Sequence, residues 1–107
     1  MSWDDEVGSE PTREEIDQTS GPVLIEFGAT WCDHCQALAP ELNRLLGAYP
    51  SIRHIKVEDG PGRPLGRSFR VKLWPTLVFL KDGETMKQIS RPEISEVQEG
   101  LNAITGR

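Results

Sequence analysis

Two cysteines separated by two residues are the feature of this sequence best suited to chemistry. Cys32 and Cys35 stand in the segment WCDHC, and the 107 residues contain no other cysteine. Such a pair forms a structural disulfide, half of a metal site or a redox-active dithiol. A disulfide across two residues closes too small a loop to add much stability. A tetrahedral metal site would also need His34 and His54, which lies on a different predicted element. The redox interpretation explains the placement best, and no metal site is expected.

The pair directly follows the apolar run VLIEF and begins a helical pattern. At the first turn of a helix, unpaired backbone amides and the positive end of the dipole stabilise a thiolate, so Cys32 is the expected nucleophile. Cys35 would then resolve the mixed disulfide by attacking the Cys32 sulfur. A protonated His34 would favour the reduced form, and Asp33 would oppose it, although His34 as an exposed bystander remains the alternative. A CxxC motif near a βαβ pattern indicates redox activity.

The remaining sequence predicts the elements that hold this pair. A capping box at Thr12 to Glu15 begins a short helix that ends near residue 19. The other predicted elements are a buried strand at 22–27, a helix from the cysteines to Gly47 kinked at Pro40, a strand at 52–57, a short helix at 64–69, a strand at 76–80, a turn at 81–84, a strand at 85–89, and a last amphipathic helix capped by Ser90-Arg91-Pro92-Glu93.

This order predicts an α/β fold in which helices cover both faces of a central mixed sheet. In such sheets, ligands and chemistry gather at the carboxyl ends of the strands, where WCDHC stands. Length and composition fit one domain, which we place at residues 11–107, after a flexible acidic N-terminal arm at residues 1–10.

The charge and hydropathy patterns exclude several classes of partner. Residues 1–20 contain seven acidic residues and one basic residue, which argues against nucleic acid as a partner. We interpret the cationic stretch of Arg63, Arg67, Arg70 and Lys72 as a solvated face. No apolar run approaches the roughly 18 residues of a membrane span. The acidic start lacks the features of a secretory signal, so we expect a cytoplasmic protein.

The sequence resembles the thioredoxin family over about residues 11–105. The matching segments are VLIEF, GATWCDHCQALAPEL with its proline five residues after the second cysteine, Trp74-Pro75 followed by TLVFLKDGE, and the closing helix. Locally, LIEF and CQALAPEL are similar to the catalytic domains of protein disulfide isomerases, whose centre also has His before the second cysteine. The resemblance implies the thioredoxin fold.

The resemblance also implies roles for residues around the cysteines. Pro75 matches the family's cis-proline, beside which a substrate chain pairs with the backbone of Trp74 as an added strand. Trp31 matches a tryptophan that packs beside the centre. Glu26 matches a buried acid beneath the second cysteine, a suitable proton acceptor for the Cys35 thiol, although a strand residue reaching solvent is the alternative.

Some positions depart from the family's pattern or leave an alternative open. Lys56 aligns with a lysine near the buried acid, and an ordinary exposed strand lysine fits equally well. Asp-His replaces the Gly-Pro of typical thioredoxins, so their reducing character does not carry over. Trp74 is bulkier than the usual residue, and Arg91 lies where the family places a small turn, so both are expected to narrow substrate choice.

We therefore expect a thiol-disulfide oxidoreductase that reduces protein disulfides, with a redox-active Cys32–Cys35 disulfide and no bound cofactor. The resemblance implies an NADPH-dependent thioredoxin reductase as electron donor, and we expect a monomer. The alternative is an adaptor or chaperone that binds extended chains through Trp31, Trp74 and Pro75 while the cysteines stay idle or regulatory. Direction of electron flow is left open, because reductases, isomerases and oxidases share these residues.

Overall fold

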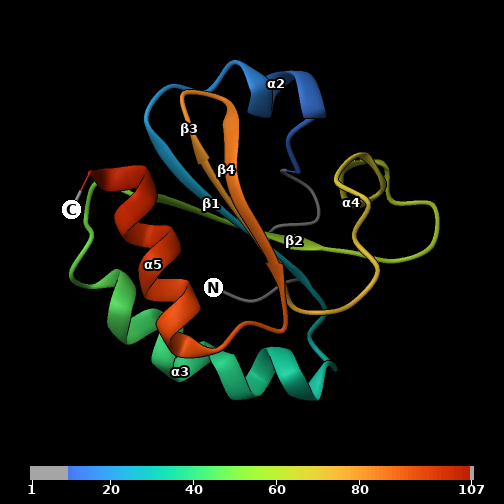
Figure 1. Cartoon of the computed structure of the whole chain (residues 1–107). Helices are drawn as coiled ribbons and strands as arrows, with labels where there is room; N and C mark the ends of the chain where they lie inside the picture. The colour runs from blue at the N-terminus through green and yellow to red at the C-terminus, as the bar shows by residue number, and fades with distance from the viewer. Residues whose placement is uncertain (1–9, 107) are drawn as a thin grey trace.

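The computed structural model describes residues 10–106, which form four strands and four helices (Figure 1). In chain order, the elements are α2 (Arg13–Asp17), β1 (Pro22–Gly28), α3 (Asp33–Leu46), β2 (Arg53–Glu58), α4 (Pro64–Ser68), β3 (Thr76–Lys81), β4 (Glu84–Ser90) and α5 (Ile94–Thr105). This order confirms the predicted succession of elements. The predicted arm at 1–10 lies outside the described residues except for Glu10. No helix within the described range has both the length and the apolar character needed to cross a membrane.

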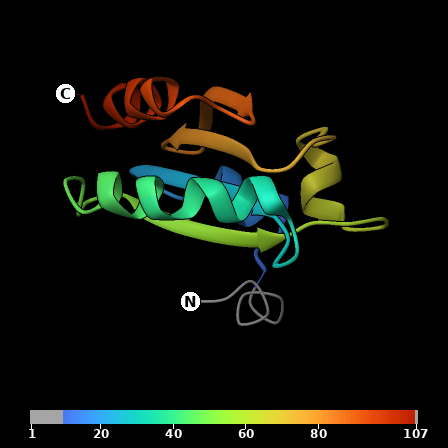
Figure 2. The ribbon, with the colours of Figure 1, turned by 90° about the horizontal axis from the view of Figure 1, so that it is seen from below.

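The strands form one mixed sheet in the order β2, β1, β3, β4. β1 pairs parallel with β2 and antiparallel with β3, and β3 pairs antiparallel with β4. Figure 2 shows the strands in this order from the lower to the upper part of the view. β1 is therefore a central strand, which accounts for its apolar residues on both faces.

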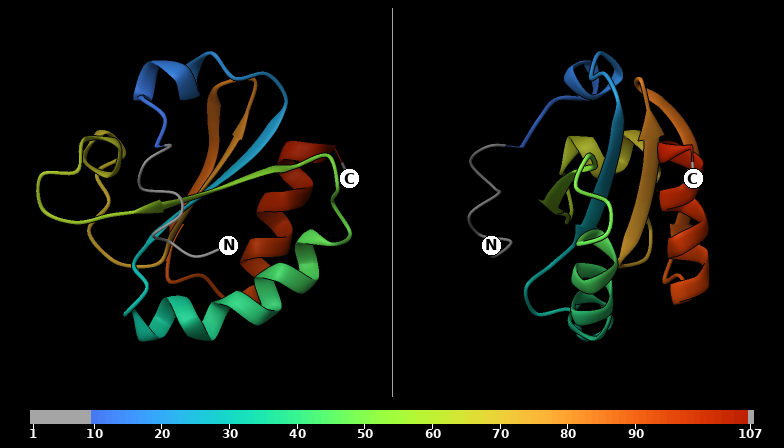
Figure 3. Two further views of the ribbon diagram at one scale, coloured as in Figure 1. Left: turned by 180° about the vertical axis from the view of Figure 1, so that it is seen from behind. Right: turned by 90° about the vertical axis from the view of Figure 1, so that its left-hand side faces the viewer.

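Side chains from β1 alternate between two apolar cores, one on each face of the sheet. Val23, Ile25 and Phe27 join the core formed with α2 and α4, whereas Leu24 joins the core formed with α3 and α5. Figures 1 and 3 show α4 and α5 on opposite sides of the strands. The predicted fold class is thus confirmed, and Glu26, two residues beyond Leu24 in β1, lies on the α3 and α5 face.

Two local sequence signals form the structures expected of them. Thr12 Oγ1 accepts a hydrogen bond from the Glu15 N–H at 3.1 Å, and Glu15 Oε1 accepts one from the Thr12 N–H at 2.9 Å, which completes the capping box of α2. Asp82 and Gly83 join β3 to β4 with φ of 51° and 81°. Positive φ at both positions is typical of a two-residue hairpin turn.

The predicted cap of the last helix is wrong by three residues. Ser90 remains in β4, where it pairs with Thr76 and its hydroxyl lies 2.8 Å from Thr76 Oγ1. The N-cap of α5 is Glu93, and Glu96 Oε1 accepts a hydrogen bond from the Glu93 N–H at 2.8 Å. Ladder pairing keeps the chain extended at Ser90, so the helix begins only after Pro92.

Candidate active site around the two cysteines

The two cysteines lie just beyond the carboxyl end of β1, at the start of α3, and no disulfide joins them in this structure. Cys32 is the N-cap residue of α3, and its Sγ accepts a hydrogen bond from the Cys35 N–H at 3.2 Å. Both side chains are buried, with 7% of Cys32 and 3% of Cys35 exposed. The predicted placement of the pair at a helix start is therefore found, and the backbone amide favours negative charge on the Cys32 sulfur.

The surroundings of Cys35 hold its proton in place. Burial and the hydrogen bond to the Cys32 side chain raise the pKa of Cys35 to about 12, with smaller contributions from the charges of Cys32 and Glu26. A backbone hydrogen bond at Ala29 acts in the opposite direction. Cys35 is thus a thiol at neutral pH, and its attack on another sulfur requires a group that removes the proton.

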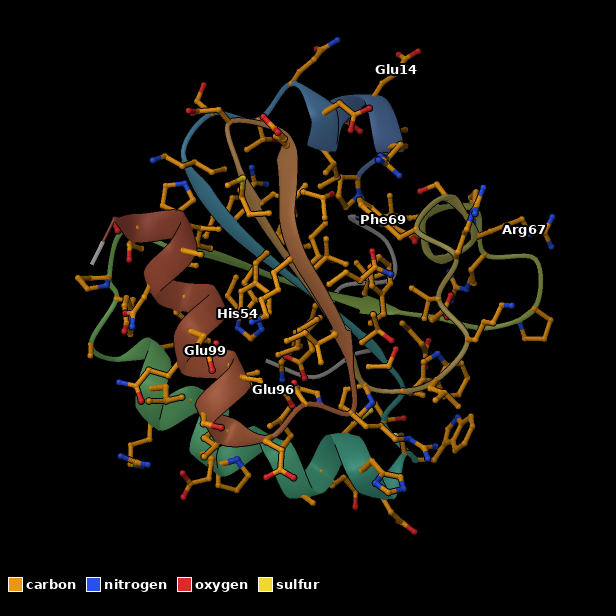
Figure 4. All side chains as sticks on the ribbon, viewed as in Figure 1. Glu14, His54, Arg67, Phe69, Glu96 and Glu99 are labelled. Carbon is orange, nitrogen blue, oxygen red and sulfur yellow. The ribbon has the colours of Figure 1, made fainter. Side chains whose placement is uncertain are left out.

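Glu26 lies on the face of the sheet that α3 and α5 cover, and it is only 1% exposed. Its Oε1 lies 2.7 Å from Nε2 of His54 on the neighbouring strand β2. The His54 side chain, labelled in Figure 4, is 20% exposed. The charge of Glu26 is also one of the smaller contributions to the raised pKa of Cys35.

From the sequence, His54 was a candidate only as a metal ligand, and its contact with Glu26 was not predicted. The signal was available, because His54 and Lys56 stand two residues apart on one face of a strand that pairs with β1. The parallel register sets His54 opposite Leu24 and Lys56 opposite Glu26. Lys56 therefore does lie beside the acid in the sheet, and its role there remains a prediction.

Trp31 and Trp74 form an aromatic pair beside the cysteines. Their ring centroids are 5.2 Å apart in an edge-to-face arrangement, and 69% of Trp31 is exposed. Trp74 packs against the cluster of Ala29, Cys32 and Cys35, and its Nε1–H donates a hydrogen bond to Asp59 Oδ2 at 2.9 Å. Asp59 follows β2, and nothing in the sequence pattern pointed to this contact.

The segment from Trp74 to Thr76 meets Arg91 across the end of the sheet. The Trp74–Pro75 peptide bond is cis. Arg91 Nε donates a hydrogen bond to the Trp74 carbonyl at 3.0 Å, and the Arg91 N–H donates one to the Pro75 carbonyl at 2.7 Å. Arg91 has a φ of 49°, a left-handed conformation that is unfavourable for most side chains. The arginine therefore already binds the carbonyl of Trp74, the residue whose backbone the resemblance assigns to substrate pairing.

A surface hollow of about 380 Å³ opens at Cys32. Its lining combines most of the predicted site residues with two that were not predicted, Lys72 and Leu73. The full lining is Trp31, Cys32, Asp33, His34, Lys72, Leu73, Trp74 and Arg91. A neighbouring hollow of about 250 Å³ shares His34 and Arg91 and is lined also by Pro75. The cysteine that is suited to attack thus faces an open groove rather than an enclosed cavity.

The family model described as Thioredoxin matches residues 6–103. The chain belongs to the thioredoxin family. It is a protein-disulfide oxidoreductase of that family with a Cys32–Cys35 pair, and the predicted family and enzyme class are confirmed.

Individual thioredoxins are similar over most of the chain. The structure of reduced thioredoxin 2 from Pseudomonas aeruginosa PAO1 superposes with a TM-score of 0.79 and 51% identity, covering 91% of each chain. Thioredoxin Asp f 28 of Aspergillus fumigatus is 33% identical over 88 residues, which are 81% of this chain and 82% of that protein.

A protein disulfide-isomerase is similar over a shorter segment. Protein disulfide-isomerase A2 of Pongo abelii is 46% identical over 65 residues, which span 57% of this chain and 12% of the isomerase.

The thioredoxin family's exchange reaction needs no bound cofactor. Within residues 10–106, no group of three or more His, Cys, Asp or Glu side chains is arranged to hold a metal ion.

Proposed function

We propose that this thioredoxin-family chain reduces disulfides of protein substrates, with Cys32 as the nucleophile and Cys35 as the resolving thiol. The observation that carries the proposal is the contrast between the two sulfurs. Cys32 Sγ accepts a backbone N–H at the helix start, whereas the pKa of Cys35 is raised to about 12. Cys32 is therefore suited to attack as a thiolate, and Cys35 stays protonated until a base removes its proton.

The reaction has two exchange steps. The Cys32 thiolate attacks a substrate disulfide, which forms a mixed disulfide and releases one substrate thiolate. Glu26 then takes the Cys35 proton, and the Cys35 sulfur attacks Cys32 Sγ. This step closes the Cys32–Cys35 disulfide and releases the second substrate thiolate, so the substrate gains two electrons and the dithiol loses two.

Substrate chains are proposed to lie in the hollow at Cys32, extended along Trp74 and Pro75. The exposed face of Trp31 and the edge of Trp74 offer an apolar contact for the residues that flank a disulfide. Arg91 restricts this groove, because its hydrogen bond to the Trp74 carbonyl must be shared or displaced when a strand is added. Substrate selection by Trp74 and Arg91 follows from this competition.

The proposed setting is the cytoplasm, with an NADPH-dependent thioredoxin reductase as electron donor and a monomer as the working form. Both cysteines of the sequence belong to the reactive pair, so no cysteine remains for a structural disulfide of the kind found in oxidising compartments. The similarity to thioredoxin 2 and to Asp f 28 over most of their length supports a reducing role.

Two measurements test the proposal. A Cys35→Ser variant incubated with an oxidised protein such as insulin is expected to accumulate a mixed disulfide at Cys32, seen by mass spectrometry. A Cys32→Ser variant is the matched control, because it lacks the attacking sulfur and should trap nothing. Trapping by neither variant would refute the assignment of Cys32 as nucleophile.

The reduction potential of the pair decides the direction of electron flow. Equilibration in glutathione or dithiothreitol buffers, followed by alkylation and mass spectrometry, gives the dithiol fraction. A reduction potential of about −270 mV supports a reductase. A reduction potential of about −180 mV or above would instead identify the protein as an isomerase or oxidase.

A further inference from the structure

The resolving step depends on where the Glu26 carboxylate is held. Glu26 is almost completely buried, and a buried carboxylate without hydrogen-bond partners is energetically costly. General acid-base transfer also requires the accepting oxygen to lie within hydrogen-bond reach of the proton. A side chain that holds the Glu26 carboxylate in place would therefore affect the rate of proton transfer from Cys35 to Glu26.

One contact that holds Glu26 comes from the edge strand β2. His54 Nε2 lies 2.7 Å from Glu26 Oε1, well within hydrogen-bond distance. An ionised carboxylate only accepts hydrogen bonds, so Nε2 carries the hydrogen and donates it when Glu26 is charged. This contact engages one of the two carboxylate oxygens of Glu26.

The surroundings make this contact specific. The core on the α3 and α5 face of the sheet is formed mainly by apolar side chains, such as Leu24 and Leu42. Among the described residues, the titratable groups on this side include Glu26 on β1, Cys35 on α3, Lys56 on β2, Lys87 on β4, which pairs with Glu99 on α5, and Tyr49, whose hydroxyl donates to Asn102 on α5. Within the described residues, the imidazole of His54 thus meets Glu26, the carboxylate whose charge contributes to the raised pKa of Cys35.

We propose that His54 is a positioning residue for the resolving step, which orients Glu26 through the Nε2–H to Oε1 hydrogen bond. This inference rests on the proposed function, because it assigns a role in the transfer of the Cys35 proton to Glu26. His54 does not touch the reacting sulfurs, so it has no part in the first attack by Cys32.

The test compares two amides at position 54. A Gln side chain places its amide nitrogen where Nε2 stands, whereas Asn is shorter and its amide corresponds to Nδ1. His54→Gln is therefore expected to keep the hydrogen bond, and His54→Asn to lose it. Arg53→Gln, an exposed change in the same strand, is the control for altering β2.

Single-turnover reactions with oxidised insulin, quenched with acid and alkylated, separate the formation of the mixed disulfide from its resolution. We expect His54→Gln to resolve within about twofold of the parent rate and His54→Asn to resolve roughly 10- to 100-fold more slowly, the loss typical of a displaced catalytic group. Formation measured in the Cys35→Ser background should be the same in all variants. Equal resolution rates for Gln and Asn would overturn the role of His54.

Failure of this inference is distinguishable from failure of the proposed function. If Cys35→Ser traps a mixed disulfide but the two amide variants behave alike, only the role of His54 is wrong. If Cys35→Ser traps nothing, the nucleophile itself is wrongly assigned. Thermal unfolding of each variant shows whether a slow rate reflects loss of the folded protein, and a rate corrected for the folded fraction then decides between the outcomes.

Discussion

Replacing Glu26 by Gln removes the proposed proton acceptor while keeping the size of the side chain and an oxygen for His54. The pKa of Cys35 is raised to about 12, so without an acceptor roughly one thiol in 10⁵ is ionised at pH 7. A positioned general base typically contributes about 10²- to 10⁴-fold to such a step. We therefore expect Glu26→Gln to resolve mixed disulfides about 100-fold more slowly at pH 7.

The same substitution has a smaller effect in the opposite direction. The charge of Glu26 is one of the contributions that raise the Cys35 pKa, so its removal lowers that pKa. Burial is the largest contribution and stays in place. Loss of the acceptor should therefore dominate near neutral pH, and the deficit should shrink as the pH rises, because more Cys35 ionises without help.

The assay is a single turnover with oxidised insulin, stopped by acid at intervals and analysed by alkylation and mass spectrometry. Glu26→Gln should accumulate a mixed disulfide at Cys32 that the parent protein does not. Glu41→Gln, which removes an exposed acid from α3, is the control for a loss of charge. Resolution by Glu26→Gln at the parent rate at pH 7 would refute the role of Glu26.

Three further predictions concern pH, substrate choice and packing. The pKa of Cys35 in the folded protein lies above its ordinary value of 9.0, so the free energy of unfolding of the reduced protein should fall as the pH rises from about 9 toward 12. Urea unfolding of a Cys35→Ala variant should not show this fall. Arg91→Gly removes a hydrogen bond of about 1 kcal/mol to the Trp74 carbonyl, so kcat/KM for bulky disulfide substrates should rise about fivefold. The folded protein should not lose stability, because residue 91 has a left-handed backbone conformation that glycine adopts readily. An unchanged kcat/KM would exclude competition at this carbonyl. Gly100→Ala would place a Cβ 2.5 Å from Phe79 Cε2 and should lower the free energy of unfolding by roughly 1–3 kcal/mol. Urea titration measures this loss, and an unchanged urea midpoint would show that α5 shifts on the sheet without cost.

The parts of the molecule that could be predicted from sequence depend on local signals. The apolar run from Val23 to Phe27 indicates a central strand whatever its partners are, and the Thr12 capping box forms within one turn. The cysteine pair at a helix start is likewise encoded by adjacent residues. Ser90 shows the limit of such signals, because a serine three residues before a glutamate satisfied the capping pattern while ladder pairing with Thr76 decided its conformation.

The contacts that could not be predicted join residues far apart in the sequence. His54 meets Glu26 across a parallel strand pair, and the meeting depends on a register that sequence periodicity does not specify. Asp59 accepts a hydrogen bond from the indole of Trp74 only because the loop after β2 packs against the segment before β3. Both contacts involve polar side chains, whose partners the hydrophobic pattern does not reveal.

The alternation of β1 has a consequence for how this protein tolerates changes in length. A residue inserted before Pro22 would fall in a loop, where added length costs little. A residue inserted between Pro22 and Glu26 would shift the register of the rest of β1 by one residue relative to β2 and β3, which turns each later side chain to the other face of the sheet. Glu26 would then point into the apolar core beneath α2 and α4, and a hydrophobic side chain would stand beneath Cys35. Such a protein would keep both thiols yet lose its proton acceptor, so the reactivity of the centre is tied to an intact strand register.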